Sequence, residues 1–178
     1  SIDSPLWLFN LYTQRFLPGE VGSLTANAFN FWWLVNPGAI LDTQIYMGLS
    51  ARMWGIVATL VGYGVTLVIA RKQGMSHKLF LAFAIVSLIT FLFMTRIHER
   101  YMYPFFPLAT IALASFRWLW IPYVLLSVSH LLNLYHLFWA PGIPAIEALY
   151  ANPLLAITLS AVNIICALYI IVRFYKSL

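Results

Sequence analysis

Charged residues are scarce in this chain. Only 8% of its 178 residues are Asp, Glu, Lys or Arg, against about 25% in an ordinary soluble domain. This scarcity excludes an ordinary soluble globular protein. The formal net charge of +5 does not indicate nucleic-acid binding, because the Lys and Arg residues are scattered between apolar runs and are not grouped on one soluble face.

Cysteine is nearly absent as well, since Cys166 is the only one and lies within an apolar run. A single cysteine excludes an intramolecular disulfide and leaves the redox compartment undetermined. The sequence also lacks a nucleophile–base pair and a glycine-rich phosphate loop. His130 and His136 stand six residues apart with no carboxylate or thiolate beside them. We therefore predict no metal site and no cofactor, and we assign no catalytic residue.

Hydrophobic residues dominate, at 62% of the chain. Runs of about 20 apolar residues can cross the hydrocarbon core of a membrane, which is about 30 Å thick. The sequence predicts an all-α fold, a polytopic bundle of about five transmembrane helices. The third span is short and carries two prolines, so a tilted helix and a re-entrant hairpin both remain open for it. The five windows are approximately 53–70, 79–95, 103–118, 119–139 and 153–172.

Residues 1–52 contain no predicted span and form a separate region before the transmembrane module 53–178. Two stretches in this region, 5–12 and 25–34, are short and rich in aromatic residues, which predicts interfacial helices at headgroup level. The chain begins at Ser1 with neither an initiator Met nor a signal sequence. We expect either earlier spans in the same gene product or a leader that was removed.

Alternating the five spans divides the charges unequally between the two sides of the membrane. Six Lys and Arg residues fall on the side of the C-terminus and four on the side of the N-terminus, where all five acidic residues also fall. The positive-inside rule then predicts a cytoplasmic C-terminus and an exterior N-terminus.

The stretch 95–104 places four ionisable residues within five positions at the end of an apolar run. A charge at the bilayer centre costs about 2.5 to 3.5 kcal/mol, so we expect this cluster at the membrane–water boundary. Helical spacing would put Arg96 and Arg100 on one face, with Glu99 able to pair with Arg96. Two fixed guanidinium groups suit a phosphate or diphosphate. The alternative is a salt bridge that only anchors the helix end. Asp42 and Glu99 are the only acidic candidates near this site.

The residues after the cluster are aromatic, and they predict either a wall that stacks on a sugar or prenyl chain or an ordinary membrane aromatic belt. They are Tyr101, Tyr103, Phe105 and Phe106.

Two further sets of residues follow helical spacing inside predicted spans. Polar residues are expected to face the bundle and form hydrogen bonds between helices; they are Ser129, Asn133, His136, Ser160 and Asn163. Small residues predict close helix packing or a partner interface; they are Gly55, Ala58, Gly62 and Gly64.

The run RIHERYMYPFFPLATIAL at 96–113 resembles the HERY-type motif in the C-terminal half of bacterial integral-membrane glycosyltransferases of the GT-C superfamily. The run NAFNFWW at 27–33 is similar to a segment that precedes this motif in those proteins. A looser similarity is to the His-Glu-Lys motif of the ER glucosyltransferases that use dolichyl-phosphate-glucose. The resemblance covers most of residues 20–118.

The resemblance implies an enzyme of the bacterial inner membrane that transfers a sugar from a polyprenyl-phosphate donor on the exterior face. The residues that match the motif are expected to lie near the lipid phosphate, together with the neighbouring Tyr103; they are Arg96, His98, Glu99, Arg100 and Tyr101. The catalytic carboxylate of the family lies in an N-terminal module of several spans, which this sequence does not contain.

The sequence leaves two functions open. The first is the C-terminal lipid-carrier-binding module of a GT-C-like glycosyltransferase, with membrane lipids, a polyprenyl-phosphate-linked sugar and a further module or subunit as partners. The second is a noncatalytic transmembrane subunit of a larger membrane complex, structural or lipid-binding. A transporter segment is disfavoured, because the predicted spans lack buried acidic residues for ion coupling.

Overall fold

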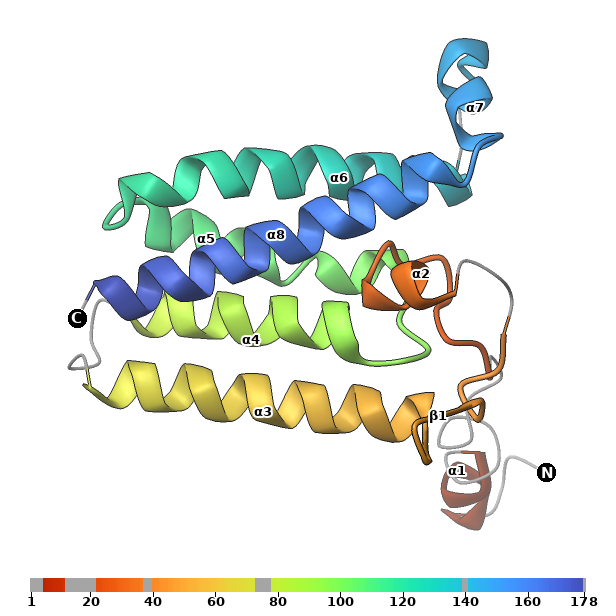
Figure 1. The fold of residues 1–178 in the computed structure, drawn as a ribbon, viewed down its shortest axis with the longest axis horizontal. Coiled ribbons are helices and arrows are strands. Elements are labelled where there is room, and N and C mark those ends of the chain that lie inside the picture. The colour runs from red at the N-terminus through yellow and green to blue at the C-terminus, as the bar shows by residue number, and fades with distance from the viewer. Residues whose placement is uncertain (1–4, 12–21, 37–39, 73–77, 139–140, 178) are drawn as a thin grey trace.

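A computed structural model of the chain describes residues 5–11, 22–36, 40–72, 78–138 and 141–177. Within these ranges the protein is mostly helical (Figure 1). The elements in chain order are α1 (Pro5–Leu11), α2 (Phe31–Val35), β1 (Ile45–Tyr46), β2 (Leu49–Ser50), α3 (Ala51–Lys72), α4 (Leu79–Phe93), the 3₁₀ helix η2 (Glu99–Met102), α5 (Phe105–Leu113), the 3₁₀ helix η3 (Arg117–Leu119), α6 (Trp120–Phe138), α7 (Pro144–Tyr150) and α8 (Leu154–Lys176).

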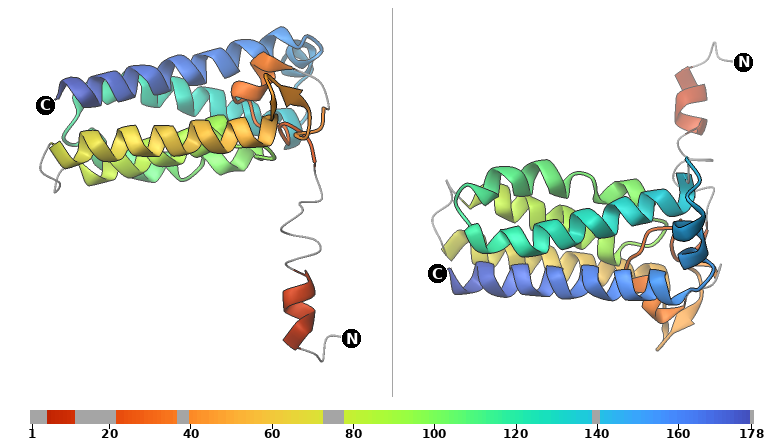
Figure 2. Two further views of the ribbon diagram at one scale, coloured as in Figure 1. Left: turned by 60° about the horizontal axis from the view of Figure 1, so that its bottom comes forward. Right: turned by 90° about the horizontal axis from the view of Figure 1, so that it is seen from above.

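The helices α3, α4, α5, α6 and α8 run along a common axis (Figure 1). Helix α4 packs against both α3 and α5, and α6 packs against α8. The antiparallel hairpin of β1 and β2, together with α2, η2 and α7, lies at one end of the bundle, which we call the hairpin end. At the opposite end α3 and α8 finish and α4 begins, and we call this the C-terminal end; Figure 2 shows the same arrangement from two further directions.

Two helices, α3 and α8, are long and apolar enough to cross a membrane, and they cover the first and fifth predicted spans. Their length and composition suggest a membrane protein. The five-span bundle is not confirmed, because α4 has 15 residues and α5 only nine. At 1.5 Å per residue these helices are about 22 Å and about 14 Å long, below the 30 Å of a hydrocarbon core.

The third predicted span, 103–118, is thus much shorter as a helix than the sequence indicates. The backbone N–H groups of Ser115 and Phe116 both bond to the carbonyl of Ala112, which closes α5 before Arg117. At the other end of the predicted span, Tyr103 caps the 3₁₀ helix η2 and the α-helix begins only at Phe105.

Helix α4 is the centre of the core. Its sequence is apolar on every side, as is typical of a helix surrounded by other helices. The buried residues of α4 are Leu81, Ala82, Ala84, Ile85, Leu88, Ile89, Phe91 and Leu92. Other elements complete the same core cluster with Met102, Phe105, Leu119, Leu126, Ile170 and Phe174.

The small-residue strip of α3 provides close packing at two positions. A Cβ atom added at Gly55 would lie 2.6 Å from the carbonyl oxygen of Phe93, and one added at Gly62 would lie 2.8 Å from the side chain of Ile89. Only glycine therefore lets α3 approach α4 this closely. Gly64 differs, because its added Cβ meets nothing within 4 Å.

The predicted helix 25–34 is replaced by an irregular segment, 24–30, followed by the short helix α2. The segment 24–30 is not a surface element, since Leu24, Phe29 and Asn30 are fully buried. A buried backbone outside helices and sheets must find hydrogen-bond partners for its N–H and C=O groups. Tertiary contacts supply them, and so the local aromatic pattern misled the prediction.

The polar residues of α6 and α8 supply part of those partners. The Asn133 side chain donates to the carbonyl of Asn27 (2.6 Å) and accepts from the N–H of Phe29 (2.9 Å). The Asn163 side chain donates to the carbonyl of Phe29 (2.8 Å). These residues are buried, as predicted, together with Ser129 and Ser160. The two asparagines bind the segment 24–30 instead of forming the predicted bonds between helices.

Candidate functional site

The charged cluster at 95–104 lies at the hairpin end and begins as a loop. Helix α4 ends at Phe93, and Arg96 has a left-handed backbone with φ of 60°. The loop pairs with the segment 24–30, because the Arg96 N–H donates to the carbonyl of Leu24 (3.2 Å) and the Ala26 N–H donates to the carbonyl of Ile97 (3.0 Å). The prediction that Arg96 and Arg100 share one helical face is therefore wrong. Pairing with a distant strand-like segment displaces the helix.

Arg96 is bound by Asp42, not by Glu99 as helical spacing predicts. Its Nε donates to Asp42 Oδ2 (2.7 Å) and its Nη2 donates to Oδ1 (3.0 Å), while the Thr95 hydroxyl donates to Oδ2 (3.2 Å). The Asp42 side chain is fully buried. Such a bidentate pair fixes the guanidinium in one orientation.

The hydrogen bond to Asp42 raises the pKa of Arg96; partial burial lowers it, and the charge of the carboxylate raises it further. Arg96 is thus a cation whose planar group is already directed at a protein carboxylate. Asp42 is itself held by its backbone, because its N–H donates to the carbonyl of Gly22 and its own carbonyl accepts from the N–H of Arg52. The pair ties the loop after α4 to the start of α3.

Glu99 is the second buried acid of this end, with a side chain that is 0% exposed. Its Oε1 lies 3.7 Å from Arg100 Nη1, and its Oε2 lies 4.0 Å from His98 Nδ1. Within the described residues neither oxygen has a hydrogen-bond donor. A buried carboxylate without hydrogen bonds is costly and attracts any nearby cation. Glu99 therefore lies within 4.0 Å of both Arg100 and His98 without a hydrogen bond to either.

Three motif residues form an exposed patch above Glu99, which we call the His98–Arg100–Tyr101 patch. The Arg100 side chain is 58% exposed and its Cζ lies 5.7 Å from the centre of the Tyr101 ring. The rings of His98 and Tyr101 meet edge to face at 5.8 Å. Tyr103, four residues after Glu99, is also exposed. The patch presents one guanidinium, one imidazole and one phenolic hydroxyl to the surroundings of the protein.

The predicted wall of four aromatic residues does not form. Phe105 is fully buried in the core, and the Phe106 ring stacks on the buried His130 at 5.0 Å. Only Tyr101 and Tyr103 of the four are exposed. The reason is the turn at Tyr103, after which α5 directs its first residues toward α4 and α6.

The hairpin end also holds an apolar pocket of about 370 Å³ that the sequence did not reveal. Two of its lining residues are joined by a hydrogen bond, which the Trp32 side chain donates to the carbonyl of Phe93 (2.8 Å). The pocket is lined by residues of α2, the hairpin, α3 and α4. These residues are too far apart in the sequence for the sequence alone to predict the pocket. The lining residues are Phe31, Trp32, Val35, Tyr46, Met47, Trp54, Ala58 and Phe93.

Chemically, the exposed patch can bind an oxyanion, because guanidinium, imidazole and phenol groups all donate hydrogen bonds. No group of three His, Cys, Asp or Glu residues that could hold a metal ion occurs in the described part of the chain. Sequence reasoning named Asp42 as an acidic candidate near this site but did not pair it with Arg96, which lies 54 residues away with no shared period.

Comparison of the chain with models of protein families, with curated proteins and with solved structures finds no match. The resemblance to the GT-C glycosyltransferases therefore depends on the motif residues alone.

Proposed function

We propose that this chain is the C-terminal, lipid-carrier-binding module of a GT-C-like glycosyltransferase of the bacterial inner membrane. Its hairpin end faces the exterior, and the phosphate of a polyprenyl-phosphate carrier binds at the His98–Arg100–Tyr101 patch. Arg100 supplies the charge, while His98 and the tyrosine hydroxyls supply further hydrogen bonds. Glu99 holds the Arg100 guanidinium in place, and Arg96 shapes the loop through Asp42.

The observation that carries this proposal is the difference between the two arginines of the motif. The Arg96 side chain is 21% exposed and bound to Asp42, whereas the Arg100 side chain is 58% exposed beside His98 and Tyr101. Guanidinium groups suit phosphate oxygens because they donate two parallel hydrogen bonds. Arg100 is the one of the two that is available for such a ligand.

Two further observations support the proposal. The two stretches that resemble the family, 27–33 and 96–113, contact each other, with isolated bridges from His98 to both Ala26 and Asn27. The apolar pocket of the hairpin end offers a surface for the prenyl chain of the same carrier. The patch supplies hydrogen-bond donors for the phosphate, and the pocket supplies an apolar lining for the prenyl chain.

The charges of the two ends support the proposed orientation. In the described ranges the charged residues of the C-terminal end are all basic, namely Arg71, Lys72, Lys78, Arg117, Arg173 and Lys176. The acidic residues of those ranges, Asp42, Glu99 and Glu147, all belong to the hairpin end. A basic end faces the cytoplasm under the positive-inside rule.

The second candidate is a noncatalytic transmembrane subunit, and one observation favours it. Exposed apolar side chains cover much of α3 and α8, which would suit contact with other helices as well as with lipid. Recovery of the chain in a stoichiometric complex with other membrane proteins, with no affinity for a lipid phosphate, would support this candidate.

The test is binding of a short-chain polyprenyl phosphate to the purified protein in detergent. We expect Arg100→Ala to weaken binding by roughly 10- to 100-fold, because a hydrogen bond to a charged group contributes about 1.5 to 3 kcal/mol. Arg52→Ala is the matched control, since it removes an exposed arginine from the same end. Equal binding by Arg100→Ala and wild type would contradict the proposal.

A further inference from the structure

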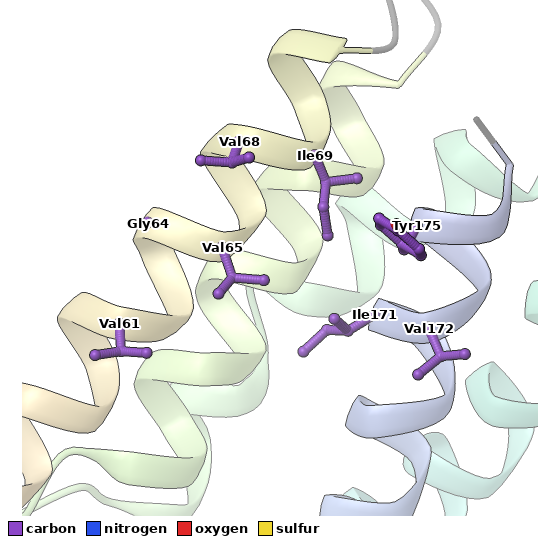
Figure 3. Close-up of a pocket in the computed structure, with 8 residues that line it drawn as sticks. All are labelled: Val61, Gly64, Val65, Val68, Ile69, Ile171, Val172 and Tyr175. Atoms are coloured by element: carbon purple, nitrogen blue, oxygen red, sulfur yellow. The ribbon is translucent and has the colours of Figure 1, made fainter.

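A second feature lies far from the hairpin end, where α3 and α8 face each other near the C-terminal end. Between them is an open groove of about 560 Å³ (Figure 3). Val65 and Ile69 of α3 face Ile171 of α8 across it. The groove is lined by Val61, Gly64, Val65, Val68, Ile69, Ile171, Val172 and Tyr175.

The groove is apolar and open to the outside of the bundle. Val61 is 60% exposed, Val68 is 55% exposed and Tyr175 is 56% exposed. Gly64 keeps one wall open, since a Cβ there would meet nothing within 4 Å. From Val61 to Ile69 the wall is about 12 Å long, at 1.5 Å per residue. This length is close to the depth of one leaflet, about half of a 30 Å hydrocarbon core.

The groove ends in positive charge. Arg71 follows Val68 by three residues, and Lys176 follows Val172 by four. At this spacing each cation lies on the same helix face as the groove-lining residue, about one turn closer to the C-terminal end. Lys78 lies at the same end, where its Nζ donates to the carbonyl of Ser177 (3.0 Å). Among the described residues this end has no acidic side chain to neutralise these cations.

We propose that the groove binds one acyl chain of an anionic phospholipid whose phosphate meets Arg71 and Lys176. An apolar channel of leaflet depth fits the chain, and the cations at its mouth fit the headgroup. A second transmembrane helix fits less well, because it would bring its own cytoplasmic basic residues to an end that is already basic. The inference rests on the membrane-spanning part of the proposed function and not on sugar transfer.

The experiment is native mass spectrometry of the delipidated protein after addition of phosphatidylglycerol or phosphatidylcholine with identical acyl chains. The first variant, Arg71→Gln/Lys176→Gln, removes the two cations of the groove. Its matched control, Arg117→Gln/Arg173→Gln, removes two cations of the same end that lie away from the groove, since Arg173 stacks on Trp118 of η3. Gly64→Phe fills the groove at a position with free space.

We expect wild type to prefer phosphatidylglycerol, and the groove double variant to lose about 25-fold in its affinity, or about fivefold for each cation. The control double variant should retain most of the preference. Gly64→Phe should reduce binding of both lipids. Equal loss in the two double variants would overturn the proposal, as would unchanged binding by Gly64→Phe. A dimer that Gly64→Phe dissociates while lipid stays bound would also overturn it, because the occupant would then be a second copy.

The two proposals can fail separately. Loss of phosphatidylglycerol binding in the groove variants with no affinity for polyprenyl phosphate at the patch would overturn the proposed function alone. Carrier binding that depends on Arg100, together with lipid binding that is indifferent to the groove, would overturn this inference alone.

Discussion

The two ends of the bundle hold their charges in different ways. At the hairpin end Asp42 and Glu99 are fully buried, and each contacts an arginine. At the C-terminal end the described charges are basic, and Arg71, Arg117, Arg173 and Lys176 are all exposed. The acids of the first set are buried among residues of several elements, whereas the cations of the second set are exposed at or near helix ends, with Arg173 stacked on Trp118. The charges of the hairpin end should therefore be more sensitive to substitution than those of the C-terminal end.

Removal of Arg96 should have the largest effect on the free energy of unfolding. Arg96→Ala leaves the Asp42 carboxylate buried with only the Thr95 hydroxyl as a side-chain donor among the described residues. We expect the free energy of unfolding to fall by about 3 to 5 kcal/mol, as when one partner of a buried ion pair is removed. Chemical denaturation in detergent measures the loss. Arg173→Ala, at the opposite end, should cost less than about 1 kcal/mol, and a similar loss in both variants would remove the contrast between the ends.

The next largest effect is expected from the amide that supports segment 24–30. Asn133→Leu leaves the N–H of Phe29 and the carbonyl of Asn27 without their partner. Unpaired buried groups cost about 1 to 3 kcal/mol each, so we expect a loss of about 2 to 6 kcal/mol. Ser129→Ala, on the same helix, is the control, because its buried hydroxyl has no hydrogen-bond partner in the described part of the chain. Comparable thermal stability of both variants would show that the segment does not depend on Asn133.

Substitutions at two glycines of α3 test the packing of this helix against α4. Gly55→Ala would put a Cβ 2.6 Å from a backbone oxygen and should lower stability by about 1 to 3 kcal/mol through overpacking. Gly64→Ala has free space and should raise stability by about 0.5 to 1 kcal/mol, because alanine is the better helix former. Thermal melts of the two variants should shift in opposite directions. Shifts of the same sign would contradict the close contact of α3 with α4.

The smallest single effect is expected at Glu99, and it separates the two buried acids from each other. Glu99→Gln removes a buried charge that has no hydrogen-bond donor among the described residues, so stability should stay the same or rise by about 1 kcal/mol. Asp42→Asn keeps one acceptor oxygen for Arg96 but replaces the other by an amide NH2 donor, and it should lower stability by about 2 kcal/mol. Denaturation curves of the pair give the comparison. A marked loss in Glu99→Gln would mean that its carboxylate is supported by groups other than those described.

Local composition was enough to predict the long helices. The predicted spans 53–70 and 119–139 lie within two residues of the observed ends of α3 and within one of α6, and α8 starts one residue after its predicted position. These limits follow from apolar runs bounded by polar or turn residues, which are visible in any short window of sequence. The mostly helical fold could therefore be read before the structure.

The arrangement of the site could not be read in this way. The contact of Arg96 with Asp42 spans 54 residues, and those of Phe29 with Asn133 and Asn163 span 104 and 134 residues. No period connects such positions in one sequence. Helical spacing gave the wrong partner for Arg96 because it assumed that α4 continues to Arg100. The exposed positions of Arg100 and Tyr101 and the half-buried position of His98 depend on that same break.

The central claim is that the two arginines of the motif have different tasks, and one measurement tests it most directly. Arg96→Lys and Arg100→Lys both keep the charge and remove the fork that donates two parallel hydrogen bonds. Polyprenyl-phosphate binding and thermal stability should be measured for both variants in the same detergent. We predict that Arg100→Lys weakens binding at unchanged stability, and that Arg96→Lys lowers stability while the folded protein binds as wild type does. Weaker binding in Arg96→Lys than in Arg100→Lys, at equal folding, would contradict the account.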